Sequence, residues 1–146
     1  MIELVTTLVI TASSILLFGY WFRYTCLLIL SAKTAQDYAG EVAAANQLGF
    51  LGAQSELATN APNLDRLRDQ LDRDYAVLSR LIKASTGDSF IENRMLGIDY
   101  QVMRTWYRLS SGFSVVAARR ALEEMSMVVA HMANAVGEHA VCGAAA

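Results

Sequence analysis

The chain has 146 residues, of which 54% are hydrophobic and 18% are charged, and its net charge is −2. This length allows one modest domain, and the slightly acidic balance argues against nucleic-acid binding, which is typical of strongly basic domains. One proline and nine glycines favour long helices over a turn-rich β fold. Cys26 and Cys142 are too few and too far apart for a disulfide framework, so we expect both to be free thiols.

Residues 2–31 form an apolar run that is interrupted by only two charges, Glu3 and Arg23. A stretch of about 18 or more apolar residues can cross a bilayer as a helix. The best window, residues 4–22, is about 28 Å long at 1.5 Å per residue, which matches the apolar thickness of a bilayer. A secretory signal needs a basic start, a shorter apolar core and a cleavage site. Because none of these is recognisable, we expect a retained single-pass anchor.

An aromatic cluster with one cation ends the predicted span. Amphipathic rings and a long basic side chain are favoured at a membrane–water boundary, so we predict that this interface consists of Tyr20, Trp21, Arg23 and Tyr24. If the span were residues 8–30, Arg23 would instead lie in the apolar layer and face a partner. Because Arg23 and Lys33 follow the span and no basic residue precedes it, the positive-inside rule predicts a cytoplasmic C-terminal body at the cell membrane.

Three hydroxyl side chains share one face of the predicted span. Thr7, Thr11 and Ser14 follow one another at helical spacing. Hydroxyls on such a face can bond to another helix, or to carbonyls one turn back in their own helix. We predict a helix–helix contact at this face, and the internal bonding remains the alternative.

Residues 32–58 are rich in alanine, and no proline precedes Pro62. We therefore predict that the spanning helix continues through this segment as a long cytoplasmic extension. Ala45, Gly49 and Ala53 lie four residues apart, a spacing that lets two helix backbones approach closely, so they form a second predicted helix–helix contact. Because glycine costs about 1 kcal/mol inside a helix, Gly49 could equally mark the point where this helix frays.

A linker at residues 59–62 separates the extension from a predicted antiparallel helical hairpin over residues 63–137. The first helix of the hairpin, near residues 63–84, has apolar residues at helical spacing and opposite charges on its other faces. The short connection that follows it implies an antiparallel arrangement with the next helix.

The second helix of the hairpin starts at a capping box on Ser89 and could run to residue 136, with a kink or break at residues 110–112. We expect it to bury an apolar stripe composed of Ile91, Met95, Ile98, Val102, Trp106, Leu109, Phe113 and Val116. Residues 138–146 lack periodicity and are predicted to be a flexible tail.

The potential metal ligands gather near the C-terminus: His131, Glu138, His139 and Cys142. His131 lies about two helical turns before His139, and the set lacks the paired spacing of a zinc site. No phosphate-binding loop, nucleophile elbow or Ser–His–Asp set is recognisable in the sequence. We therefore predict no catalytic, cofactor-binding or metal site.

One pattern suggests a surface for a partner or for lipid headgroups, and it consists of Tyr100, Arg104, Tyr107 and Arg108. Arginines among aromatic rings can bind a lipid headgroup or the acidic patch of a protein. The alternative is that Trp106 belongs to the core stripe and the arginines simply flank it.

The sequence thus predicts an all-α fold: a single-pass transmembrane helix that continues into a long cytoplasmic helix and packs with an antiparallel, coiled-coil-like hairpin. We expect a non-catalytic membrane-anchored interaction or scaffold protein that contacts membrane lipid and either further copies of itself or a larger membrane complex. An accessory subunit of a respiratory or transport complex is the main alternative. A third is a ligand-binding bundle with a pocket of Met95, Met103, Trp106 and Phe113, although such residues are more often core.

Overall fold

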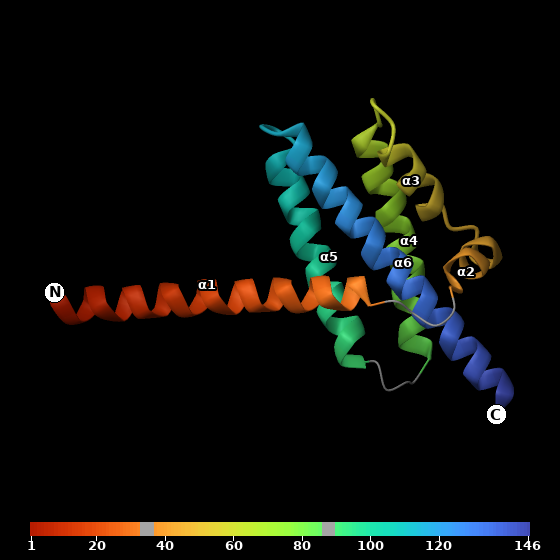
Figure 1. Cartoon of the computed structure of the whole chain (residues 1–146), viewed down its shortest axis with the longest axis horizontal. Coiled ribbons are helices and arrows are strands. Elements are labelled where there is room, and N and C mark those ends of the chain that lie inside the picture. Colours follow the sequence, from red (N-terminus) through yellow and green to blue (C-terminus); the bar gives the residue numbers. More distant parts are fainter. Residues whose placement is uncertain (33–36, 86–89) are drawn as a thin grey trace. The chain divides into compact units, whose positions relative to one another are not determined.

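The structure is a computed structural model that describes residues 1–32, 37–85 and 90–146. The described residues are all-α, as predicted, and contain no strand. The helices in chain order are α1 (Ile2–Ser31), α2 (Ala39–Asn46), α3 (Phe50–Leu57), α4 (Leu64–Ala84), α5 (Phe90–Ser110) and α6 (Val115–Ala145) (Figure 1). The chain divides into two compact units, Met1–Ala32 and Lys33–Ala146, and we call the second unit the helical body.

The first unit is α1, a helix that is apolar on all of its faces. Leucines, isoleucines and valines along its length are exposed, and none of the residues in its most apolar stretch is buried. Apolar side chains all round a helix require an apolar environment all round it. By length and composition α1 is a candidate membrane span, and a signal sequence near the N-terminus would have the same properties.

The predicted continuation of α1 into one long helix is wrong. Ala32 follows α1 in an extended conformation with ψ 122°, and the alanine-rich segment forms the two short helices α2 and α3. Between them, Gln47 adopts a left-handed conformation with φ 55°. Both short helices pack against α6, and they bury Val42 and Phe50 in doing so. Burial of the apolar side chains of α2 and α3 against α6 is favourable. This gain in free energy offsets the loss of the helical hydrogen bonds at the break.

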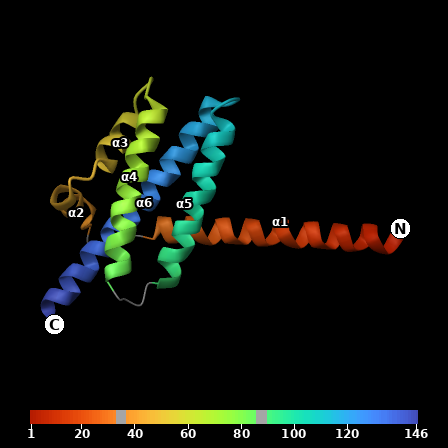
Figure 2. The same ribbon diagram turned by 180° about the vertical axis from the view of Figure 1, so that it is seen from behind.

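Helix α6 is the central element of the helical body. It contacts α5, α4, α2 and α3, and Figure 2 shows it crossing behind α4 and α5. Its fully buried side chains include Leu122, Met125, Val128 and Val129, while α4 contributes Leu67, Leu71 and Leu78. Full burial of one such side chain stabilises the fold by about 1.5–3 kcal/mol, so the packing of the other helices around α6 forms the core.

The chain reverses at residues 111–114, the position of the predicted kink or break. The backbone N–H groups of Phe113 and Ser114 both donate to the carbonyl of Ser110, and the Ser114 hydroxyl caps α6 by accepting from the N–H of Ala117. The antiparallel pair in contact is therefore α5 with α6. The predicted hairpin of α4 with α5 is not formed as such, because no Cα atoms of the described parts of these two helices approach within 8 Å.

The C-terminal residues 138–146 also differ from the predicted flexible tail, because α6 remains helical to Ala145. Gly137 lies just before this C-terminal part of α6, at the point where the helix packs closely against the chain around Tyr38. A Cβ atom at Gly137 would overlap the Tyr38 side chain and lie 3.3 Å from Val42 Cγ2. Glycine is required here by the close approach of the two segments.

We expect Gly137→Ala to lower the melting temperature of the full chain in an uncharged detergent, followed by circular dichroism. Overpacking a well-packed site costs about 1–3 kcal/mol, and the atom that is struck, Tyr38 Cβ, cannot rotate away. Gly143→Ala on the same helix is the matched control, because a Cβ there meets nothing within 4 Å, and it should leave the melting temperature unchanged or slightly higher. Equal melting temperatures for the two variants would contradict the close packing at Gly137.

Candidate functional site

The face of helix α5 that is buried in the body carries both apolar and polar side chains, and it is not the face of the predicted apolar stripe. Its buried residues are Leu96, Asp99, Tyr100, Met103, Tyr107 and Ser110. Met95 is half-buried, and the rest of the predicted core stripe is 44–72% exposed: Ile91, Ile98, Val102, Trp106, Leu109, Phe113 and Val116. The prediction that this stripe is buried is therefore wrong. Periodicity identified the apolar face correctly, but polar contacts to α4 decided which face turns inward.

Three side chains of α5 reach across to two carboxylates of α4. Tyr100 Oη donates to Asp72 Oδ1 at 2.9 Å, and Arg104 Nε donates to Asp72 Oδ2 at 2.9 Å. Tyr107 Oη donates to Asp65 Oδ1 at 2.8 Å. We call these five residues the polar bridge. The two bonds to Asp72 satisfy one lone pair on each carboxylate oxygen, which is how a half-buried charge remains stable.

Two further side chains of α4 extend the polar bridge. The ring of Tyr75 stacks on that of Tyr100, with centroids 4.0 Å apart and an interplanar angle of 3°. The guanidinium of Arg68 lies 5.7 Å from the centroid of the Tyr107 ring, within the range of a cation–π contact. Because α4 and α5 do not meet through their backbones, these long side chains set the distance between the two helices.

The two tyrosines of the polar bridge are held in their neutral form. Burial, reinforced by the charge of Asp72, raises the pKa of Tyr100 well above its usual range. Burial, and then the hydrogen bond to Asp65, raises the pKa of Tyr107 to about 12. A neutral phenol is a hydrogen-bond donor, so both groups serve here as donors to carboxylates and not as bases.

The four residues predicted as a partner or headgroup surface do not lie on one exposed face. Tyr100 and Tyr107 are buried, and Arg104 is bonded to Asp72. Of the four, Arg108 is the one with an exposed side chain. The aromatic and basic pattern that the sequence shows at this place therefore belongs mainly to the contact between α4 and α5.

The hydroxyl face of α1 follows the alternative in which each hydroxyl bonds within its own helix. Thr7, Thr11 and Ser14 donate to the carbonyls of Glu3, Thr7 and Ile10, each at 2.8 Å. Their polar groups are thus satisfied without a second helix. A helix–helix contact at this face stays a prediction. Because the hydroxyls are already bonded within α1, close packing of side chains would have to stabilise it.

The second predicted helix–helix contact does not share one helix face, because the chain breaks near Gln47. Ala45 is exposed in α2, Gly49 precedes α3, and Ala53 is buried in α3. The N–H of Gly49 donates to Asp74 Oδ2 at 2.9 Å. A Cβ at Gly49 would also overlap the side chain of Gln70, so this glycine allows a close approach to α4 within the body.

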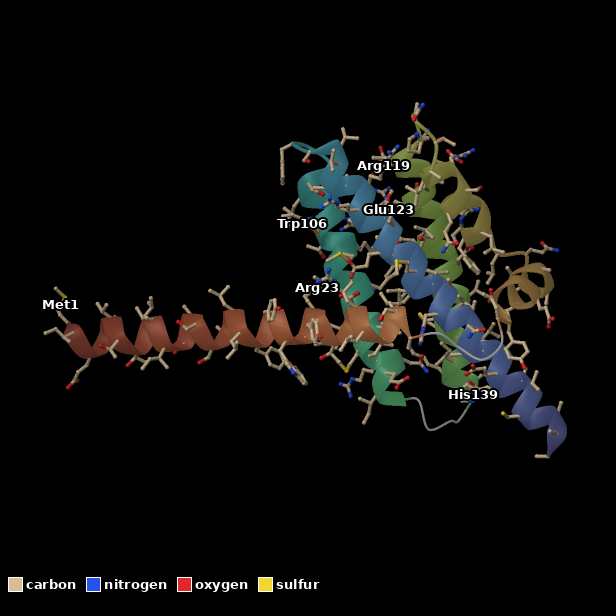
Figure 3. All side chains as sticks on the ribbon, viewed as in Figure 1. Met1, Arg23, Trp106, Arg119, Glu123 and His139 are labelled. Carbon is tan, nitrogen blue, oxygen red and sulfur yellow. The ribbon has the colours of Figure 1, made fainter. Side chains whose placement is uncertain are left out.

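The predicted membrane interface lies past the middle of α1. Tyr20, Trp21 and Tyr24 are exposed, and the rings of Tyr20 and Tyr24 stack with centroids 6.5 Å apart. Figure 3 labels Arg23, which lies between them in the chain. Their place at a membrane–water boundary stays a prediction.

A groove of about 960 Å³ lies on the side of the polar bridge where α4 ends and α5 begins. Its apolar lining comes from three helices: Ile82 of α4, Ile98 and Val102 of α5, and Met132 of α6. Tyr75 also lines it, together with the polar side chains Ser79, Lys83, Ser85, Asn93, Arg94, Gln101, Thr105 and His139 (Figure 3 labels His139). Sequence reasoning missed this groove, because it exists only where the polar bridge holds α4 and α5 apart.

The pocket predicted from methionines and aromatics is not the one that forms. Met103 is buried in the core, and Trp106 and Phe113 form an exposed edge-to-face pair with centroids 6.4 Å apart. Of the possible metal ligands near the C-terminus, His131 has a pKa lowered by burial, an effect that the nearby charges of Glu92 and Glu138 oppose. Within residues 1–32, 37–85 and 90–146, no three His, Cys, Asp or Glu side chains are placed to hold a metal ion.

No protein-family model, curated protein or solved structure matches the chain. The features that a partner or ligand can reach are the apolar surface of α5, the groove beside it, and α1.

We expect Tyr100→Phe to reduce the free energy of unfolding by about 1–3 kcal/mol, measured by denaturant titration of the full chain in an uncharged detergent. The variant removes a donor to a charged, half-buried carboxylate and leaves Asp72 with Arg104 alone. Tyr75→Phe is the matched control, because it keeps the stacked ring and no hydrogen bond of its hydroxyl is seen among the described residues. A loss at Tyr75 as large as that at Tyr100 would show that the ring stack, and not the bond to Asp72, carries the stability.

The raised pKa of Tyr107 predicts a loss of stability at alkaline pH. The phenol ionises near pH 10 in the unfolded chain and at about 12 in the folded one, so its contribution is complete below pH 10 and is lost as the pH rises through about 12. We expect the free energy of unfolding to fall over this interval, and Tyr107→Phe to reduce the slope. An unchanged slope for Tyr107→Phe would contradict the assignment.

Proposed function

We propose that this chain is a membrane-anchored helical interaction protein without catalytic activity, which assembles through exposed apolar side chains at the end of α5. These residues surround the turn between α5 and α6, and we call them the apolar turn: Trp106, Leu109, Phe113, Val115 and Val116. Each is 45–70% exposed. Large apolar side chains gathered on a surface are typical of protein–protein contacts, where aromatic anchors contribute most of the binding energy.

The observation that supports this proposal most strongly is the inverted packing of α5. Its apolar side chains face outward while the buried tyrosines of the polar bridge face α4. An outward apolar face costs solubility unless another molecule covers it. The polar side chains of the bridge are, in turn, engaged in structural hydrogen bonds and are not presented to a substrate.

The anchor in this proposal is α1. Its side chains over residues 2–21 are exposed in all directions, and the hydroxyls of Thr7, Thr11 and Ser14 are bonded internally, which suits a helix in a hydrocarbon environment. We place the helical body on the cytoplasmic side, because Arg23 and Lys33 follow the apolar run and no basic residue precedes it.

An accessory subunit of a larger membrane complex is the second candidate. A shallow furrow runs along one face of α1 and is lined by Leu4, Thr7, Leu8, Thr11 and Ala12, with Glu3 and Ile15 at its ends. Small and hydroxyl-bearing residues beside leucines allow another spanning helix to pack closely. In this case α1 makes contacts with polytopic partners, and the apolar turn binds another part of the same complex.

Cysteine crosslinking in native membranes tests the apolar turn. In a chain carrying Cys26→Ser and Cys142→Ser, we expect Phe113→Cys to form disulfide-linked dimers on mild oxidation, because Phe113 is at the centre of the proposed contact. Arg80→Cys, at an exposed position on α4, should remain monomeric. Replacing Trp106 and Leu109 by serine should weaken self-association at least about tenfold, the effect of losing one anchor residue.

Purification in a mild detergent separates the two candidates. Crosslinked homodimers without other subunits support the scaffold, whereas stoichiometric co-purification of polytopic subunits, lost in the Leu8→Trp variant of the α1 furrow, supports the accessory role. A strictly monomeric chain that crosslinks at neither cysteine and carries no partner would overturn both.

A further inference from the structure

We propose that the groove between α4 and α5 binds an anionic single-chain amphiphile, with its acidic head between Lys83 and Arg94 and its acyl chain along the apolar lining. The shared chemistry is a carboxylate or phosphate group on one acyl chain, as in a fatty acid or a lysophospholipid. The basic end of this site lies near the start of α5, whereas the apolar turn surrounds the end of that helix.

The shape and lining of the groove suit an acyl chain. Its volume of about 960 Å³ lies within the range of about 300–1,000 Å³ that is usual for small-molecule sites. Met132, which is 3% exposed, forms part of the floor, and Ile82, Ile98 and Val102 form the walls. From Arg94 to Thr105 the groove follows α5 for about 16 Å at 1.5 Å per residue, the length of an extended acyl chain of medium size.

One end of the groove is basic. Lys83 lies in the last turn of α4 and Arg94 near the start of α5, so both belong to the end at which these two helices are connected. Both are exposed, neither has an ion-pair partner among the described residues, and no described Asp or Glu lines the groove. Two cations, with no carboxylate in the lining that the structure describes, favour an anionic group.

An aromatic side chain from α4 also lines the groove. Tyr75 lines the groove and stacks on Tyr100, which is itself fixed by its bond to Asp72. The Tyr75 ring thus adds a fixed aromatic surface to the lining. Because the polar bridge sets the separation of α4 and α5, the site is present before a ligand arrives, and binding pays little for ordering side chains.

Photolabelling of the full chain in nanodiscs of zwitterionic lipid tests this proposal. The probe is a laurate analogue that carries a diazirine at the end of its chain, and the modified residues are mapped by tandem mass spectrometry. We expect saturable labelling of α4 and α5 near the stacked rings, in peptides from residues 75–105. Labelling that does not saturate, or that falls mainly on α1, would overturn the proposal.

Two groove variants and a charge-matched control make the test specific. Lys83→Glu with Arg94→Glu should lower the affinity at least about tenfold, the effect of losing one charge-assisted hydrogen bond, and Val102→Trp should block labelling by filling the groove. Arg80→Glu with Arg120→Glu changes the net charge equally at exposed positions outside the groove and should leave labelling unchanged. Equal losses in the two charge-reversed variants would overturn the site, and circular dichroism confirms that each variant is folded.

Competition experiments define the head group. Unlabelled laurate and lauryl phosphate should compete with the probe, and their relative potencies show whether the site prefers a carboxylate or a phosphate. Acetate and inorganic phosphate should not compete, because they lack the acyl chain. Competition by lauryltrimethylammonium as effective as that by laurate would contradict the role of Lys83 and Arg94.

Discussion

The carboxylate of Asp72 organises the helical body, because it accepts hydrogen bonds from both Tyr100 and Arg104 of a helix that its own helix does not touch through the backbone. A carboxylate that accepts from a neutral and a charged donor remains stable in a half-buried position. Without it, a buried phenol and a guanidinium would lose their acceptor at once, and such losses in a polar network exceed the sum of single bonds. The distance between α4 and α5 therefore depends on this one acidic group and the side chains that reach it.

Several properties of the surface follow from this contact. Because the tyrosine face of α5 is required at α4, the opposite face carries its apolar residues outward, and the exposed Trp106 and Phe113 pair is a direct consequence. The same contact keeps α4 and α5 apart, so α6 lies across both and closes the floor of the groove with Met132. The two surfaces for which we propose functions thus have a common origin in the orientation of α5.

The two units of the chain satisfy their polar groups in different ways. In α1 the hydroxyls of Thr7 and Thr11 bond to carbonyls one turn back, so the helix needs no polar partner and its apolar side chains can face a hydrocarbon environment. In the helical body, polar groups are paired between elements: the N–H of Gly49 donates to Asp74, and the N–H of Tyr38 donates to Asn134 Oδ1. Hydrogen bonds within a single helix suit a lipid environment, whereas hydrogen bonds between different elements specify one tertiary arrangement.

Local sequence determined α1 and the start of α4. The apolar run over residues 2–31 forms α1, and the start of α4 beside Pro62 is confirmed by the Asn63 side chain, which accepts from the N–H of Arg66. The tertiary structure alone decided which face of α5 is buried, that the chain breaks at Gln47, and that a groove exists. The physical reason is that helical periodicity depends on residues three or four positions apart, whereas Tyr100 and Asp72 are separated by 28 residues. A buried phenol bonded to a carboxylate on another helix can outweigh an apolar stripe, and no local pattern shows which carboxylate will be within reach.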